Sequence, residues 1–129
     1  MVEMTYKYFG ERDLKEAEIL LKFGAFSSAG RFSQQAVEKY LKQYIEDNGD
    51  TGDIGFLATH NTVSLYERVV KLGGLEFDKD CHKMMFVLRS YYYDTNYPGV
   101  DARELGKEEA ADAVNFAKEL ISSIKWKNR

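Results

Sequence analysis

The chain has only one proline, Pro98, and one cysteine, Cys81, in 129 residues. With so few helix breakers and no useful stretch of strand-like alternation, the sequence is expected to be helical over most of its length. A lone cysteine excludes an internal disulfide, which suits a reducing compartment. Cys81 and His82 are neighbours that point about 100° apart on a helix, and no second ligand cluster accompanies them. We therefore expect no metal site.

The sequence also lacks a strong charge of one sign and a long apolar run. Its formal net charge is −3, so no overall basic field attracts nucleic acid, and contact with RNA or DNA would need a local patch. No segment approaches the roughly 20 apolar residues that span a bilayer, and residues 1–8 show no secretory signal. These absences predict a cytoplasmic protein without a membrane span.

The composition is that of one globular domain, which we expect to cover residues 1–129. Hydrophobic residues make up 44% and charged residues 30%, a balance that argues against disorder. Aromatic residues reach 14%, with nine tyrosines and eight phenylalanines. Surplus tyrosine favours helix packing seams or partner surfaces.

Apolar residues recur at helical spacing in five segments. We expect helices at about residues 4–23, 27–47, 61–72, 77–94 and 107–125, with irregular segments at 50–55 and 95–104. Glycines and the Pro98-Gly99 pair separate these helices. Four long helices and one short helix joined by short loops predict an all-α, up-and-down antiparallel bundle.

Several polar motifs accompany this helix pattern. Residues 11–18 read ERDLKEAE, residues 33–42 read SQQAVEKYLK, and Thr59-His60 precedes the third expected helix. The fourth expected helix ends in a tyrosine-rich stretch before Tyr97-Pro98. In order and spacing these motifs resemble the HEPN domain family (higher eukaryotes and prokaryotes nucleotide-binding) over nearly the whole chain.

The resemblance implies a bundle that dimerises through its second and fourth helices. Many members of the family are metal-independent ribonucleases, often toxins. Others are non-catalytic, and bind nucleotides or pair with a minimal nucleotidyltransferase encoded nearby.

The ribonuclease members carry an arginine followed, after four to six residues, by a histidine at the end of the fourth helix. Histidine can move a proton at the ribose 2′-hydroxyl while arginine stabilises phosphate charge. Arg89 stands at the arginine position, but the positions open to histidine hold Asp94, Thr95 and Asn96. Asparagine does not titrate, and aspartate is a poor base at neutral pH. The departure argues against ribonuclease activity.

Two interpretations of residues 89–97 remain open. In one, Arg89 pairs with a carboxylate at a plain helix end whose tyrosines pack. In the other, this segment borders a cleft at the dimer interface, because arginine clamps phosphate and tyrosine stacks on bases. The second interpretation predicts ligand contacts from Arg89, Tyr93, Asn96 and Tyr97, and from Gln35 and Lys39 on the second helix.

Gln35 and Lys39 belong to a stripe with Arg31 and Lys42 that either faces solvent or borders the cleft. His60 is expected to cap or anchor the loop before the third helix. His82 lies two turns before Arg89, about 10 Å along the axis, too far for one reaction centre within a subunit.

The sequence thus predicts a non-catalytic homodimer without a metal or cofactor. It would bind a nucleotide, another phosphate ligand or a minimal nucleotidyltransferase partner, as in a toxin–antitoxin pair. Two alternatives stay open: a divergent metal-independent endoribonuclease that uses Arg89, and a helical interaction module without a ligand.

Overall fold

The computed structural model describes residues 3–49, 52 and 54–127. Within them the chain forms helices α1 (Tyr6–Lys22), α2 (Phe26–Asn48), α3 (Ile54–Leu57), α4 (Thr62–Lys71), α5 (Lys79–Asn96) and α6 (Lys107–Ser123). The described residues contain no β-strand. The predicted all-α fold is therefore confirmed, and α5 is the fourth helix of the sequence prediction.

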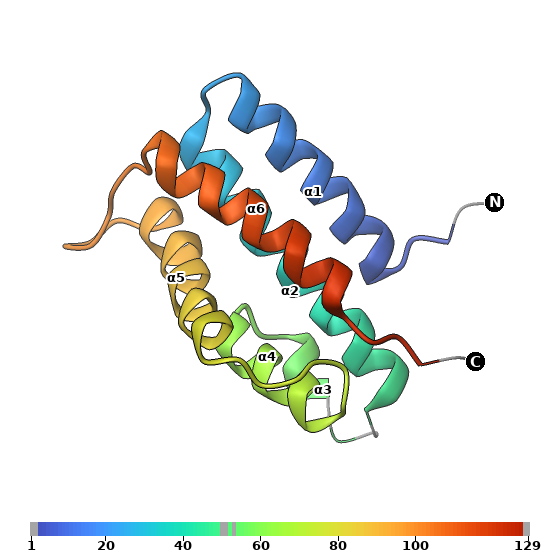
Figure 1. Ribbon diagram of the computed structural model, residues 1–129. Helices are drawn as coiled ribbons and strands as arrows, with labels where there is room; N and C mark the ends of the chain where they lie inside the picture. Colours follow the sequence, from blue (N-terminus) through green and yellow to red (C-terminus); the bar gives the residue numbers. More distant parts are fainter. Residues whose placement is uncertain (1–2, 50–51, 53, 128–129) are drawn as a thin grey trace.

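The helices surround α2, which packs against each of the others. Figure 1 shows α1 and α5 on opposite sides of the α2–α6 pair, with the short helices α3 and α4 beside the C-terminal half of α2. The core lies where α2, α4, α5 and α6 meet. Its fully buried side chains include Val37, Leu41, Tyr44, Leu65, Tyr66, Val69, Met85, Leu88, Ala113 and Ala117.

Side-chain caps mark the starts of α1, α4 and α5. Thr5 accepts a hydrogen bond from the Tyr8 amide, and Asn61 accepts from the amides of Val63 and Ser64. Asp78 accepts from the Cys81 amide, so α5 begins at Lys79, two residues later than predicted. Each cap satisfies an amide that has no partner within its helix.

Besides shifts of one or two residues at other helix ends, the structure differs from the prediction before α4 and at the end of α5. The short helix α3 was not predicted, since residues 50–55 were expected to be irregular; of these, residues 50, 51 and 53 lie outside the described part. Helix α5 continues to Asn96, although an irregular segment was expected from Thr95. The Thr95 hydroxyl donates to the Tyr91 carbonyl, and the chain becomes extended only at Tyr97, before Pro98.

None of the helices in the described part of the chain has the length and apolar character needed to cross a bilayer.

Candidate ligand-binding site

The C-terminal half of α5 carries four of the predicted ligand contacts. Arg89, Tyr93 and Asn96 are spaced four and three residues apart, so they share one face of the helix, and Tyr97 follows as its C-cap. The Arg89 guanidinium lies 5.5 Å from the centre of the Phe86 ring. Among the described residues, no carboxylate forms an ion pair with Arg89. The carboxylate partner expected for a plain helix end is therefore not found there.

Three tyrosines form a cluster at the end of α5. The ring centroids are 5.2 Å apart for Tyr92 and Tyr93, 6.2 Å for Tyr92 and Tyr97, and 6.0 Å for Tyr93 and Tyr97. Tyr93 and Tyr97 are about half exposed, so their rings are available for stacking. Burial, then the hydrogen bond with Tyr97, then the charge of Glu38 raise the pKa of Tyr92 to about 12. The Tyr92 phenol is consequently neutral near pH 7.

A row of polar side chains on α2 is buried beside this cluster. Gln34, Glu38 and Lys42 follow at steps of four residues, with relative exposures of 0%, 4% and 5%. Lys42 Nζ donates to Glu38 Oε2 at 2.9 Å, and Gln34 Nε2 donates to Glu38 Oε1 at 3.1 Å. Burying such charges is costly unless both partners are paired and hydrogen-bonded. The row is thus a network in which Glu38 is the central acceptor.

His60 connects this buried network to the surface. Its Nδ1 lies 3.1 Å from Glu38 Oε1, and its ring stacks on Tyr92 with centroids 4.8 Å apart and planes 21° apart. The His60 side chain is 49% exposed, and its Nε2 has no hydrogen-bond partner among the described residues. The sequence predicted that His60 caps or anchors the loop before α4. His60 anchors this loop to α2, and the N-cap of α4 is Asn61.

Sequence reasoning did not assign Glu38, His60 or Tyr92 to the site. The available signal was a polar row with a spacing of four residues on a helix whose other positions are mostly apolar. The partner of that row, His60, lies 22 residues further along the chain than Glu38. Only the packing of the loop before α4 against α2 brings the two side chains together.

The four residues of the predicted stripe on α2 have different surroundings. Lys39 Nζ forms an ion pair with the fully buried carboxylate of Asp13 on α1. Because α1 and α5 lie on opposite sides of the α2–α6 pair (Figure 1), Lys39 does not join Arg89 within one chain. Lys42 is buried rather than solvent-facing. The Arg31 guanidinium donates to Ser28 Oγ, and the partly exposed Gln35 side chain has no hydrogen bond to described residues.

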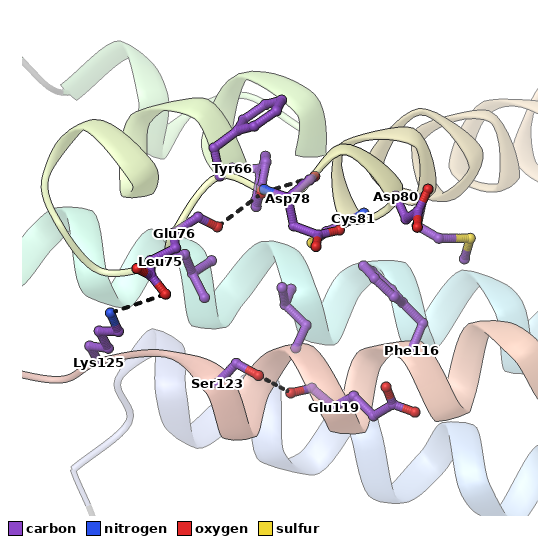
Figure 2. A pocket seen from close by; sticks show the side chains of 13 residues that line it. Tyr66, Leu75, Glu76, Asp78, Asp80, Cys81, Phe116, Glu119, Ser123 and Lys125 are labelled. Carbon is purple, nitrogen blue, oxygen red and sulfur yellow. Dashed lines mark hydrogen bonds and ion pairs between the residues drawn. The ribbon is translucent and has the colours of Figure 1, made fainter.

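A cavity of about 560 Å³ lies away from these residues, between the start of α5, the turn before it and α6 (Figure 2). Apolar side chains including Leu75 and Phe116 share its wall with four carboxylates, those of Glu76, Asp78, Asp80 and Glu119. Burial is the main cause that raises the pKa of the Cys81 thiol to about 11, so this part of the wall is uncharged near pH 7. An acidic rim repels phosphate, so this cavity does not suit an anionic ligand.

The other histidine of the chain, His82, lies on α5 two turns before Arg89. His82 Nε2 lies 3.0 Å from a Glu67 carboxylate oxygen, and the His82 ring contacts Phe77 and Phe86, at 5.3 Å each. His82 therefore has its contacts on the α4 side of α5.

Within the described residues, no three His, Cys, Asp or Glu side chains gather in a way that could hold a metal ion.

The comparison with known protein families gives a match that covers nearly the whole chain. The model of the HEPN domain matches residues 6–127. The chain belongs to the HEPN domain family. This confirms the resemblance seen in the motifs, and the match includes both the Glu38–His60 network and the α5 surface of this HEPN protein.

A solved structure shares this fold. The crystal structure of TT1696 from Thermus thermophilus superposes with a TM-score of 0.72 and is 22% identical in sequence. The similarity covers 92% of this chain and 91% of that chain. No curated protein matches this chain at a significant level.

We expect the Glu38–Lys42 pair to stabilise the fold only when both partners are present. Glu38→Gln should lower the free energy of unfolding by about 3–5 kcal/mol, because it leaves the Lys42 ammonium buried without a counter-charge. The double variant Glu38→Gln with Lys42→Met should lose less than the sum of the single variants, as measured by urea unfolding. The control Glu18→Ala removes the exposed ion pair with Lys118 and should cost less than about 1 kcal/mol. Additive losses at Glu38 and Lys42 would contradict this account.

Proposed function

We propose that this HEPN protein is a homodimer that binds a nucleotide or another phosphate ligand at the C-terminal half of α5. The observation that carries the proposal is the half-buried Arg89, which has no carboxylate partner among the described residues. A guanidinium without a counter-charge is a suitable contact for phosphate, which it binds in a planar, bidentate geometry. The proposed contacts are Arg89, Tyr93, Asn96 and Tyr97.

The tyrosine cluster supports a ligand that has a base as well as a phosphate. Tyr93 and Tyr97 present exposed rings one helical turn apart, on the same part of α5 as Arg89. A base can stack on either ring while its phosphate contacts Arg89. Lys39 is paired with Asp13 on the α1 side, so a contact from Lys39 would come from a second subunit, and Gln35 remains a proposed contact from α2.

The homodimer proposal is supported by exposed rings along α5. Phe86, Tyr93 and Tyr97 are 46%, 46% and 53% exposed, and their spacing of seven and four residues places them on one face. An exposed aromatic face of this kind favours a protein contact. A second copy of the chain is the proposed occupant, because the family resemblance implies a dimer, commonly formed through the second and fourth helices. The proposed dimer would bring two Arg89 side chains toward one cleft.

A minimal nucleotidyltransferase is the partner that we propose for the dimer. The family resemblance supports this pairing, and the product of a neighbouring reading frame would be the protein to examine. Co-expression and gel filtration of both proteins test it. Separate elution at micromolar concentrations would count against the pairing.

The position of His60 favours a second candidate function, metal-independent RNA cleavage. Helix α5 lacks the histidine of the ribonuclease motif. The loop before α4 supplies the partly exposed imidazole of His60, which contacts Glu38 and stacks on Tyr92. A histidine held at Nδ1 by a carboxylate has its other nitrogen free for proton transfer.

Ligand binding should depend on Arg89. We expect Arg89→Ala to weaken ATP binding by about 10- to 100-fold, since it removes a charge-assisted hydrogen bond. Isothermal titration calorimetry of the folded variant measures this, with tripolyphosphate as a probe that lacks the base. Arg103→Ala is the matched control, because Arg103 is already paired with Asp94 and Glu109 at 3.4 Å and 2.8 Å, and its loss should change the affinity less than about twofold. Equal binding by wild type and Arg89→Ala would overturn the proposed site.

The oligomeric state should depend on the exposed rings of α5. Sedimentation equilibrium of the wild type should give twice the chain mass of 14.9 kDa. Phe86→Glu should raise the dimer dissociation constant at least about tenfold by placing a charge in the interface. Phe23→Glu changes a ring that is 80% exposed after α1 and should have no such effect. A monomeric wild type at about 100 μM would refute the dimer, since stable homodimers bind more tightly than this.

The two candidate functions differ in their effect on RNA. Under the first, the wild-type protein should leave a mixed RNA substrate intact in the presence of a chelator. Cleavage that is lost in both Arg89→Ala and His60→Asn would instead establish the second. Gel electrophoresis of end-labelled RNA separates the two results.

A further inference from the structure

An ion pair and a hydrogen-bonding amide surround the Nδ1 side of His60. The Glu38 carboxylate already has a cationic partner in Lys42, 2.9 Å away, and accepts a further hydrogen bond from Gln34. The Nδ1–H of a neutral imidazole can donate to Glu38 Oε1, at 3.1 Å. In this tautomer the exposed Nε2 carries a lone pair, so it cannot donate a hydrogen bond to an anion.

The charged groups around His60 oppose one another. From α2, the Glu38 carboxylate lies 3.1 Å from Nδ1 and favours a proton on the ring, while Lys42, which is paired with Glu38, disfavours it. Helix α4 begins at Thr62, so the positive end of its dipole lies close to His60. From α5, Tyr92 is the titratable group that stacks on the ring, Tyr97 contacts Tyr92, and Arg89 carries a permanent positive charge one turn before Tyr92. Burial, first among its causes, raises the pKa of Tyr92 to about 12, so this phenol supplies no negative charge.

A phosphate group at the α5 surface would change this balance. The His60 ring stacks on Tyr92, which lies three residues after Arg89 and four before Asn96 on α5. Residues at these spacings are neighbours on a helix surface. A side-chain rotation of Arg89, whose guanidinium now lies over the Phe86 ring, would therefore let one phosphate contact both Arg89 and the His60 imidazole. The phosphate oxygens would repel the lone pair of a neutral Nε2, but would accept a hydrogen bond from a protonated one.

We propose that His60 is a second cationic contact for the phosphate of the ligand, and that ligand binding places a proton on its imidazole. This inference rests on the proposed function, because it requires an anionic ligand at Arg89. Glu38 fixes the ring orientation through Nδ1, Tyr92 supports its face, and the free Nε2 makes the contact. Affinity for the ligand then rises as the pH falls through the range in which histidine gains its charge.

Proton uptake tests this directly. Calorimetric titration with ATP in two buffers of different ionisation enthalpy, at pH 7.5, gives the number of protons taken up on binding. Wild type should take up more protons than His60→Asn, while the proton change of ATP itself is common to both proteins. Between pH 8 and pH 6 the wild-type affinity should rise roughly three- to tenfold more than that of His60→Asn, the range expected for one added charge-assisted contact.

Two further variants separate a charge effect from a structural one. His60→Lys carries a permanent charge and should bind ATP at pH 8 at least as tightly as wild type, without the additional proton uptake. His82→Asn changes the other histidine, which is already paired with Glu67, and should behave as wild type. Proton NMR of wild-type His60 with and without ATP gives the same information without a substitution, since ATP should move its titration midpoint to higher pH.

The failures of the two proposals are distinguishable. Equal proton uptake by wild type and His60→Asn, or an unchanged His60 titration with ATP bound, would overturn the role of His60 and leave the Arg89 site intact. Absence of ATP binding by the wild type would overturn the proposed function, and this inference with it.

Discussion

The packing of every other helix against α2 makes this helix buried on most of its surface. A helix in that position cannot turn a polar face to water, so its polar side chains need partners inside the protein. Two ion pairs meet this requirement. Asp13 of α1 pairs with Lys39 on one side, and Glu38 pairs with Lys42 within α2. The Asp13–Lys39 pair holds α1 against the central helix, and the contact of Glu38 with His60 holds the loop before α4 against it.

The same requirement creates the candidate site. Glu38 has more than one polar neighbour, since the Lys42 ammonium, the Gln34 amide and the His60 imidazole all lie within hydrogen-bond distance of its carboxylate. His60 is thereby held with Nδ1 in the network and its ring face on Tyr92, while Nε2 has no hydrogen-bond partner among the described residues. A core interaction thus positions a titratable group next to the surface of α5. Arg89 and the exposed tyrosines supply charge and stacking area on that surface.

The sequence predicted much of this fold because helices are encoded locally. Apolar spacing, glycines and the capping residues located the main helices to within a few residues. Two predictions were wrong because the local sequence signals were weak or in conflict. Helix α3 is a single short turn that was not predicted. Helix α5 extends past Thr95, whose hydroxyl donates a hydrogen bond to the Tyr91 carbonyl. The family followed from motif order, and four of the six predicted ligand contacts do lie together on α5.

Sequence alone determined the helix positions, the family, and the absence of histidine among residues 94–96 of α5. The tertiary structure decided which polar residues act together. Lys39 and Glu38 are adjacent in the sequence, but about 100° of rotation per residue sends one toward α1 and the other toward His60. The sequence of a helix does not identify the partner of a charged side chain, because that partner comes from another helix or loop. Only packing reveals that Lys39 is paired, that Arg89 has no carboxylate partner among the described residues, and that His60 lies beside Tyr92.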